Sequence, residues 1–231
     1  MRALLYADWC TIKNVMARYL GICLVVVVPV VVMSNEGGSD APGVFAASMF
    51  TVMLLFYVML SVFSADETAA WEQMRLTLPV TTRTVVRERY AFLVLAAFAL
   101  ATVGSALGVA TNVVLSALGM LTVPRGVVEV LGGAFGTAAF GLGYLALVIP
   151  YVFKVGMGKA RITFSLPFIA CMALNVGPVR DAFLGVLNWL EATSAALGSP
   201  LPLLAAGLAL IVAVYLVSML VSERLYAARD F

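Results

Sequence analysis

The sequence predicts an all-α, polytopic membrane protein with six transmembrane helices. It also predicts an N-terminal amphipathic elbow helix and a cytoplasmic coupling helix between the second and third spans. Of the 231 residues, 63% are hydrophobic and 11% are charged, whereas soluble domains are about half apolar and about a quarter charged. The apolar residues form blocks of about 20, the length at which a helix crosses a hydrocarbon core of about 30 Å. We therefore expect a single transmembrane domain over residues 1–231.

The chain begins with a helix predicted over residues 1–15. Leu5, Trp9 and Ile12 recur there at helical spacing, and Lys13 lies beside this apolar stripe. An amphipathic helix of this kind lies in the headgroup region of a membrane. It is interpreted either as a simple interfacial anchor or as an elbow that transmits motion into the first span.

Six apolar segments are candidate membrane spans. The fifth is shorter than a full span and is expected to extend into neighbouring turns. The six segments lie near residues 16–34, 43–63, 90–110, 130–153, 162–176 and 201–222. No A-x-A cleavage pattern follows the first segment, so a retained helix is predicted rather than a signal peptide.

Basic residues predict the orientation of these spans. All of them except Arg125 and Arg180 fall on one side of the six-span topology, and the first loop on the other side carries Glu36 and Asp40 without a basic residue. Because basic residues are concentrated in cytoplasmic loops, both termini are expected in the cytoplasm.

The composition excludes several kinds of site. The chain has no histidine, which excludes H-E-x-x-H metalloproteases, Ser-His hydrolases and haem held by histidine. Its cysteines, Cys10, Cys23 and Cys171, have no C-x-x-C spacing and indicate neither a disulfide framework nor a metal site. The net charge of +2 gives no indication of a nucleic-acid partner. We expect no catalytic, cofactor-binding or metal-binding residue and no enzyme activity in this chain.

No charged residue falls near the middle of a predicted span. Charges inside a membrane are costly and usually mark ion or proton pathways. Their absence argues against an ion-coupled pump or a voltage-gated channel. It suits a pathway for apolar or amphipathic cargo, and a purely structural membrane protein would look the same.

The cytoplasmic segment 64–89 is the most informative part of the sequence. Ser64-Ala65-Asp66-Glu67 has the S-x-x-E form of a capping box, which predicts that a short helix begins at Ser64. Pro79 breaks this helix, because the residue before a proline disfavours helical geometry. Thr81 or Thr82 then caps a new helix that enters the third span.

The short helix within this segment carries an apolar ridge. Trp71, Met74 and Leu78 recur at i, i+3 and i+7, and Arg75 lies on another face. Aromatic and methionine side chains that project from a membrane suit insertion into a groove of a partner protein. The alternative is that the ridge lies flat on the membrane surface.

A second cytoplasmic loop, residues 154–161, is short and basic. It contains Lys154, Gly156 and Lys159, but it does not meet the phosphate-loop spacing G-x-x-x-x-G-K-[ST] because Ala160 follows Lys159. No other stretch supplies a Walker motif. Any dependence on ATP is therefore expected to come from another chain.

Together these pieces resemble the small permease subunits of bacterial ATP-binding-cassette exporters of the type-2 class, which have six spans and a separate ATPase. The residues that carry the resemblance are Asp66-Glu67, Trp71, Leu78-Pro79-Val80-Thr81, Val85-Val86, Arg89-Tyr90, the run from Pro150 to Gly156, Ser222, Tyr226 and Arg229-Asp230-Phe231.

The resemblance implies a half-transporter in the bacterial cytoplasmic membrane. Two six-span permeases, identical or paired with a relative, would sit above two ATPase subunits that bind ATP and magnesium. The cargo would be an apolar or amphipathic peptide, lipid or drug moved out of the cytoplasm. The residues expected to contact the ATPase are Asp66, Glu67, Trp71, Met74, Arg75, Leu78, Pro79, Lys154, Gly156 and Lys159.

Two G-x-x-x-G motifs are candidates for close helix packing. Gly104 and Gly108 lie in the third predicted span, and Gly132 and Gly136 lie in the fourth. Small residues let helices approach closely within a membrane. The motifs are interpreted as contacts within one subunit or as a contact between two subunits.

Other functions are compatible with the spans and loops alone. One is an ATP-independent secondary transporter or channel, which predicts cargo movement by this chain alone in liposomes. Another is a non-transporting membrane scaffold. An intramembrane enzyme would need a nucleophile with a base, or paired aspartates in the membrane, and the sequence offers neither.

Overall fold

A computed structural model describes four long helices of the chain and parts of its other segments. The described ranges are 18–27, 42–68, 81–120, 126–160, 192–196 and 198–227, together with Trp9, Lys13, Met16, Pro29, Thr163, Gly185, Asn188 and Trp189. Every statement below concerns these residues.

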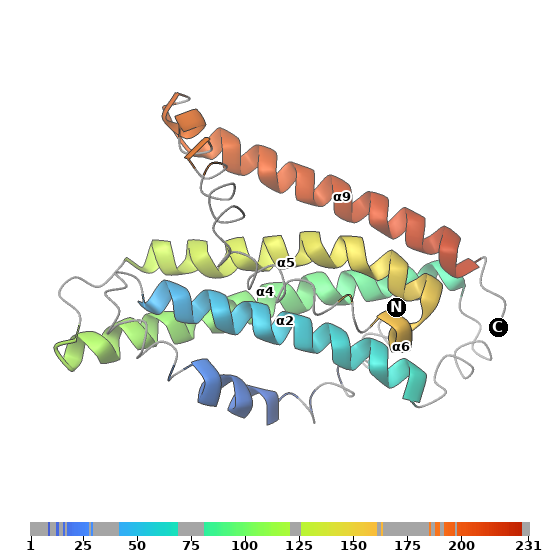
Figure 1. Cartoon of the computed structure of the whole chain (residues 1–231), viewed down its shortest axis with the longest axis horizontal. Helices are drawn as coiled ribbons and strands as arrows, with labels where there is room; N and C mark the ends of the chain where they lie inside the picture. Colours follow the sequence, from blue (N-terminus) through green and yellow to red (C-terminus); the bar gives the residue numbers. More distant parts are fainter. Residues whose placement is uncertain are drawn as a thin grey trace.

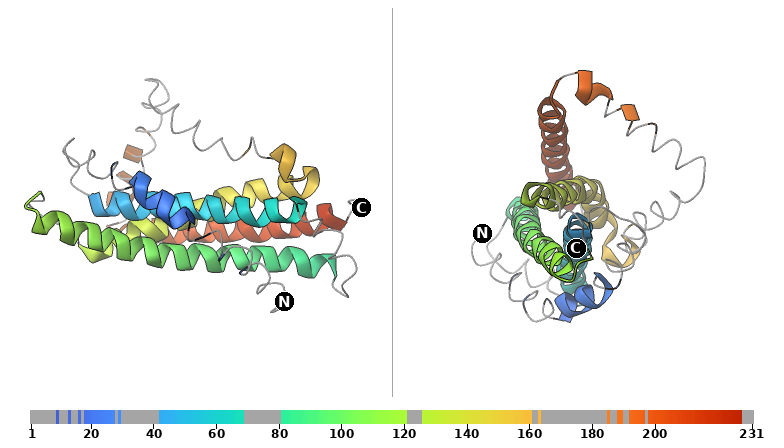
Figure 2. Two further views of the ribbon diagram at one scale, coloured as in Figure 1. Left: turned by 90° about the horizontal axis from the view of Figure 1, so that it is seen from below. Right: turned by 90° about the vertical axis from the view of Figure 1, so that its left-hand side faces the viewer.

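The described part of the chain is helical and contains no strand. Its labelled helices are α2 (Pro42–Thr68), α4 (Thr82–Ala117), α5 (Val127–Val155), α6 (Met157–Ala160) and α9 (Leu201–Ala227). Helices α2, α4 and α5 lie side by side along the long axis of the molecule, and α9 crosses obliquely over α5 (Figures 1 and 2). The shorter helix Arg18–Val27 lies on the other side of α2 (Figure 1).

Four of the predicted spans are confirmed as apolar helices of membrane-crossing length. They are α2, α4, α5 and α9, which correspond to the segments predicted near residues 43–63, 90–110, 130–153 and 201–222. Of the first predicted span, only part is described, chiefly the helix Arg18–Val27. The fifth predicted span lies outside the described residues except for Thr163, as do residues 1–15 except for Trp9 and Lys13. The count of six spans and the elbow helix therefore stay predictions.

Helix α4 begins where the sequence places its cap. The Thr81 hydroxyl accepts a hydrogen bond from the Thr84 amide at 3.3 Å, so it satisfies one of the amides that the first helical turn leaves unpaired. The helix has 36 residues and a length of about 54 Å at 1.5 Å per residue. It therefore extends past a hydrocarbon core of about 30 Å.

The structure differs from the sequence prediction at Ser64. No new helix begins there, because α2 continues without a break from Pro42 to Thr68. Starting a helix costs free energy, whereas extending one adds a hydrogen bond for each residue that is fixed. A capping-box sequence directly after a long apolar helix is therefore absorbed into that helix.

Helices α2 and α4 touch through the first G-x-x-x-G motif. A Cβ atom added at Gly104 would overlap the hydroxyl of Thr51, and one added at Gly108 would overlap the carbonyl oxygen of Gly43. Near this contact the Gly43 amide donates a hydrogen bond of 3.0 Å to Asn112 Oδ1. The absence of side chains at Gly104 and Gly108 thus lets the two backbones meet.

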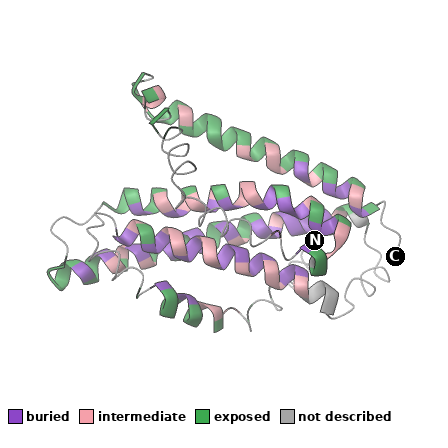
Figure 3. Cartoon of the chain, viewed as in Figure 1, coloured by how far each residue is buried: buried purple, intermediate pink, exposed green. Residues whose placement is uncertain are grey.

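Large apolar side chains fill the space between α2, α4 and α5. The largest of them that are fully buried are Phe50, Leu54, Leu55, Met59, Leu93, Leu100, Leu145 and Ile149. Figure 3 shows buried residues along the facing sides of these three helices, whereas most of α9 is exposed. The three helices form the packed core of the described chain, and α9 lies at its margin.

The second G-x-x-x-G motif has a different environment. A Cβ atom added at Gly132 or at Gly136 would meet no atom within 4 Å. Both glycines are exposed on α5. Nothing in the described part of the chain therefore packs against this pair.

The two motifs make a matched test of packing. Alanine at Gly108 would collide with backbone as well as with Val130, so we expect Gly108→Ala to lower the free energy of unfolding by about 1–3 kcal/mol. Gly132→Ala should raise it by about 0.5–1 kcal/mol, because alanine favours the helix and meets nothing. Unfolding of the purified protein by SDS in mixed micelles measures both. Equal midpoints for the two variants would contradict the packing described.

Candidate functional site

One end of the bundle collects exposed basic side chains. The C-terminal ends of α2, α5 and α9 meet the N-terminal end of α4 there, on the right in Figure 1. The exposed basic residues are Arg83, Arg87, Lys154, Lys159 and Arg224. We call this the basic end of the bundle.

A glycine turn folds the chain back at the basic end. Helix α5 stops at Gly156, which has φ 85° and whose amide donates to the Val152 carbonyl at 2.9 Å. A positive φ suits glycine because it has no Cβ atom. The short α6 follows, and its Ala160 is fully buried in the core cluster that includes Phe63 of α2 and Phe153 of α5. The turn therefore places α6 beside the end of α2.

This arrangement gathers part of the predicted ATPase contact set. Lys154, Gly156 and Lys159 lie on the turn and on α6, close to the end of α2 whose last turn contains Asp66 and Glu67. The other predicted contacts, Trp71, Met74, Arg75, Leu78 and Pro79, lie outside the described residues. Residues 69–80 connect α2 to α4, and both of those helix ends lie at the basic end.

A hydrogen-bonded network centred on Tyr90 joins three helices at the basic end. The Tyr90 hydroxyl lies 2.7 Å from Ser218 Oγ and 2.8 Å from Ser222 Oγ of α9. Ser218 donates its proton to the Ala146 carbonyl of α5, so it accepts from Tyr90. Tyr215 donates to the Tyr90 carbonyl at 2.8 Å. The network thus links α4, α9 and α5 directly.

An ion pair and an aromatic cluster lie next to this network. Arg87 Nε donates to Glu223 Oε1 at 2.6 Å, but the Arg87 side chain is 53% exposed, so the pair adds little stability. The Phe153 ring lies 5.6 Å from Phe63 and 5.3 Å from Tyr226, measured between centroids. These edge-on contacts join α5 to α2 and to α9.

Charged groups are also buried here. Glu88 and Arg89, in the second turn of α4, are 0% and 1% exposed. The Arg89 guanidinium carbon lies 5.9 Å from the centre of the Phe63 ring, within the range of a cation–π contact. The burial of these two residues places the base of α4 inside the packed end of the bundle.

Among the described residues, α9 has its buried side chains only at this end. In its apolar stretch only 6% of the residues are buried, against 56% in α2. The buried residues of α9 are Ser218, Ser222, Glu223 and Tyr226, all among the last residues of the helix, from Ser218 onward. The rest of α9 presents apolar side chains outward, including Leu204, Leu208 and Val212.

Sequence reasoning did not identify this network. It quoted Tyr90, Ser222 and Tyr226 only as residues of a resemblance. A sequence pattern could have revealed the network. The last predicted span is otherwise apolar, but it carries polar residues at i, i+3, i+7 and i+8, which places them on one face of a helix: Tyr215, Ser218, Ser222 and Glu223. A polar face on a membrane helix indicates contact with another helix.

The arrangement is suited to holding helices together. Among the described residues, no group of three His, Cys, Asp or Glu side chains could hold a metal. The polar groups pair with one another and with backbone carbonyls. What the site offers is a rigid joint between α4, α5 and α9, beside an exposed basic surface.

The four apolar helices, three of which are linked by the Tyr90 network at the basic end, define a polytopic helical membrane protein. A family model described as "ABC-2 family transporter protein" matches residues 3–227, so the chain belongs to this family. It is a membrane permease of the ABC transporter type, a transport component rather than an enzyme. The family implies association with an ABC ATPase. Comparisons with curated proteins and with solved structures give no match.

The Tyr90 network leads to a prediction about how strongly α9 is attached to the bundle. Tyr90→Phe leaves Ser222 without the Tyr90 hydroxyl, so we expect a loss of about 1 kcal/mol in the free energy of unfolding. The matched control is Tyr151→Phe, since Tyr151 is exposed on α5 and its loss should change little. Unfolding by SDS measures both variants. A network without structural importance would leave the two midpoints equal.

Proposed function

We propose that this chain is the transmembrane permease subunit of an ATP-driven exporter. Paired with a separate ATPase that binds ATP and magnesium, it moves an apolar or amphipathic substrate, such as a peptide, lipid or drug, out of the cytoplasm. The proposal places the chain in the bacterial cytoplasmic membrane with both termini in the cytoplasm. The family match over residues 3–227 supports the class of transporter.

The geometry of the basic end carries the proposal. Two segments that are far apart in the sequence, the end of α2 with Asp66 and Glu67 and the turn with Lys154 to Lys159, lie at the same end of the bundle. An ATPase seated there would contact both. The exposed basic residues of this end fit the cytoplasmic side of a membrane.

The charge distribution argues against a small ion as the substrate. The buried charged residues of the described chain are Glu88, Arg89 and Glu223, which all lie at the basic end. Farther from that end, the buried polar residues Ser105 and Asn112 are neutral. Within the described helices, an interior of this kind argues against a binding site for a small ion.

The joint at Tyr90 supports a mechanical link from the ATPase to the membrane. In the proposed mechanism, closure of the ATPases moves the 64–89 segment and the 154–161 turn. Because α4, α5 and α9 are joined at the same end, this push would turn the three helices together. A second permease, either a copy of this chain or a relative, would complete the pathway, and rotation of the two bundles would be a rigid-body transition between two states.

The orientation is tested by labelling single cysteines. In a background with the native cysteines replaced by serine, Leu118→Cys marks the exposed turn after α4 and Lys159→Cys marks the basic end. We expect a membrane-impermeant maleimide to label Leu118→Cys in intact cells. Lys159→Cys should react only after the cells are permeabilised. The reverse pattern would place the basic end outside and defeat the proposal.

The coupling segment is tested by Trp71→Ala. If Trp71 inserts into the ATPase, its loss should weaken binding of the cognate ATPase roughly thirty-fold, as for an interface hot spot. Transport driven by ATP should fall with it. Trp189→Ala is the matched control, because Trp189 is an exposed tryptophan on the predicted outer side. Co-purification and transport in proteoliposomes measure both variants. Unchanged binding and transport in Trp71→Ala would exclude the assignment, and transport without any ATPase would favour a secondary transporter or channel.

A further inference from the structure

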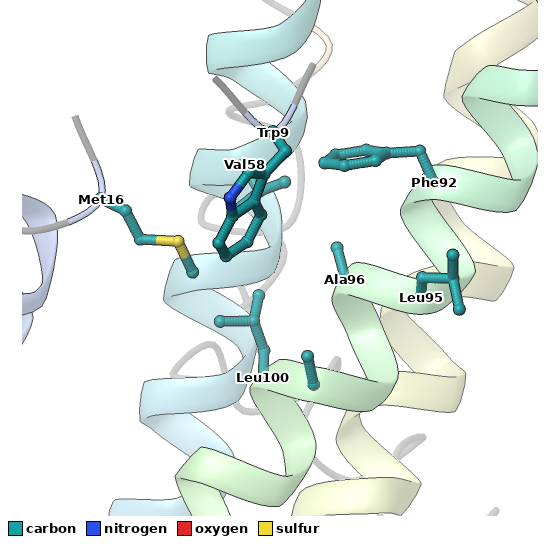
Figure 4. Close-up of a pocket in the computed structure, with 8 residues that line it drawn as sticks. Trp9, Met16, Val58, Phe92, Leu95, Ala96 and Leu100 are labelled. Atoms are coloured by element: carbon teal, nitrogen blue, oxygen red, sulfur yellow. The ribbon is translucent and has the colours of Figure 1, made fainter. Parts of the chain in front are cut away.

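An apolar groove lies between the N-terminal segment and the bundle. Its volume is about 300 Å³. Its lining residues come from the N-terminal segment, α2 and α4, and they are Trp9, Met16, Val58, Phe92, Leu95, Ala96, Ala99 and Leu100. Figure 4 shows the Trp9 indole pointing into the groove, with Met16 on one side and Phe92 on the other. We call it the Trp9 groove.

The Trp9 groove lies in the half of the bundle nearer the basic end. Phe92 is two residues from Tyr90 of the joint, which is about 3 Å along α4, and Leu100 is about 15 Å from it. On α2, Val58 is about 22 Å from Gly43, whose contact with Asn112 lies in the opposite half. In a hydrocarbon core of about 30 Å, the groove therefore faces the leaflet on the basic side.

The segment that supplies Trp9 and Met16 to the groove also carries a basic residue, Lys13. Trp9, Lys13 and Met16 are all helical, and Lys13 follows Trp9 by four residues and precedes Met16 by three. Positions with these spacings share one side of a helix. Lys13 is exposed, and no carboxylate among the described residues pairs with it. The spacing therefore puts an exposed ammonium group on the same segment as two residues of a groove whose described lining is apolar.

We propose that the Trp9 groove binds one acyl chain of an anionic phospholipid from the cytoplasmic leaflet, with the phosphate of the headgroup on Lys13. The apolar lining fits the chain, and the lysine fits the charge of that leaflet. Tryptophan is also a side chain that prefers this depth. The volume is at the lower limit of ligand pockets, about 300–1,000 Å³, so a chain fits where a drug-sized cargo does not. The leaflet assignment rests on the proposed orientation, which the Leu118→Cys labelling tests separately.

Trp9 itself reports on the occupant. With Trp71 and Trp189 replaced by phenylalanine, Trp9 is the only tryptophan of the chain. The protein is reconstituted in phosphatidylcholine vesicles that contain a fixed fraction of either phosphatidylglycerol or phosphatidylcholine with brominated chains. Bromine quenches tryptophan fluorescence on contact. We expect brominated phosphatidylglycerol to compete for the groove roughly five times better than brominated phosphatidylcholine.

Three variants test the two parts of the proposal. Lys13→Gln should remove most of this preference, whereas Lys159→Gln, which changes an exposed lysine outside the groove, should leave it intact. Ala96→Phe should fill the groove and lower quenching by both lipids. Equal quenching by both lipids in the unaltered Lys13 protein, or an unchanged preference in Lys13→Gln, would overturn the proposal. Weak quenching by both would mean that a protein segment or a second copy covers the groove, which would also overturn it.

Discussion

The hydroxyl of Tyr90 is the contact on which the arrangement of the described helices depends most. It forms hydrogen bonds with Ser218 and Ser222 of α9, and the Ser218 hydroxyl in turn donates a hydrogen bond to the Ala146 carbonyl of α5. In a membrane, lipid tails compete with apolar side chains for apolar surface, so apolar contact alone does not choose where α9 attaches. A polar group has no alternative partner in hydrocarbon. The chain of hydroxyls therefore fixes both the place and the register of α9.

The opposite half of the bundle is held differently. Around Gly104 and Gly108 the backbones of α2 and α4 are in contact, and the amide of Gly43 is satisfied by Asn112. No polar residue of α9 is buried in that half. The three-helix core is thus continuous from end to end, whereas the buried residues of α9 in the described chain lie near one end. If the ATPase acts at the basic end, as proposed, its push reaches α9 where the Tyr90 network attaches it.

The sequence was sufficient for the features that depend on local chemistry. Apolar blocks of spanning length predicted α2, α4, α5 and α9, because the hydrocarbon core sets helix length. The cap at Thr81 was also predictable, since a threonine hydroxyl before a helix satisfies a free amide. At Ser64 the same kind of reasoning failed, because the preceding helix extended through the capping pattern.

Features that depend on which helices become neighbours could not be predicted. The same G-x-x-x-G spacing occurs twice, yet Gly108 lies against α2 whereas none of the described residues packs against Gly132. Likewise Tyr90 and Ser218 are 128 residues apart in the chain, and nothing local indicates that they meet. The meeting of α6 with the end of α2 depends on the whole bundle in the same way. Tertiary packing decides these contacts.

The central claim is that a separate ATPase works on this permease from the basic end. Site-specific photo-crosslinking tests it most directly, with a photoreactive amino acid placed either at Lys159 on α6 or at Leu118 in the turn after α4. In cells that produce the cognate ATPase, we expect a crosslink to the ATPase from position 159 and none from position 118. A crosslink from position 118, or none from position 159 in a complex that still co-purifies, would contradict it.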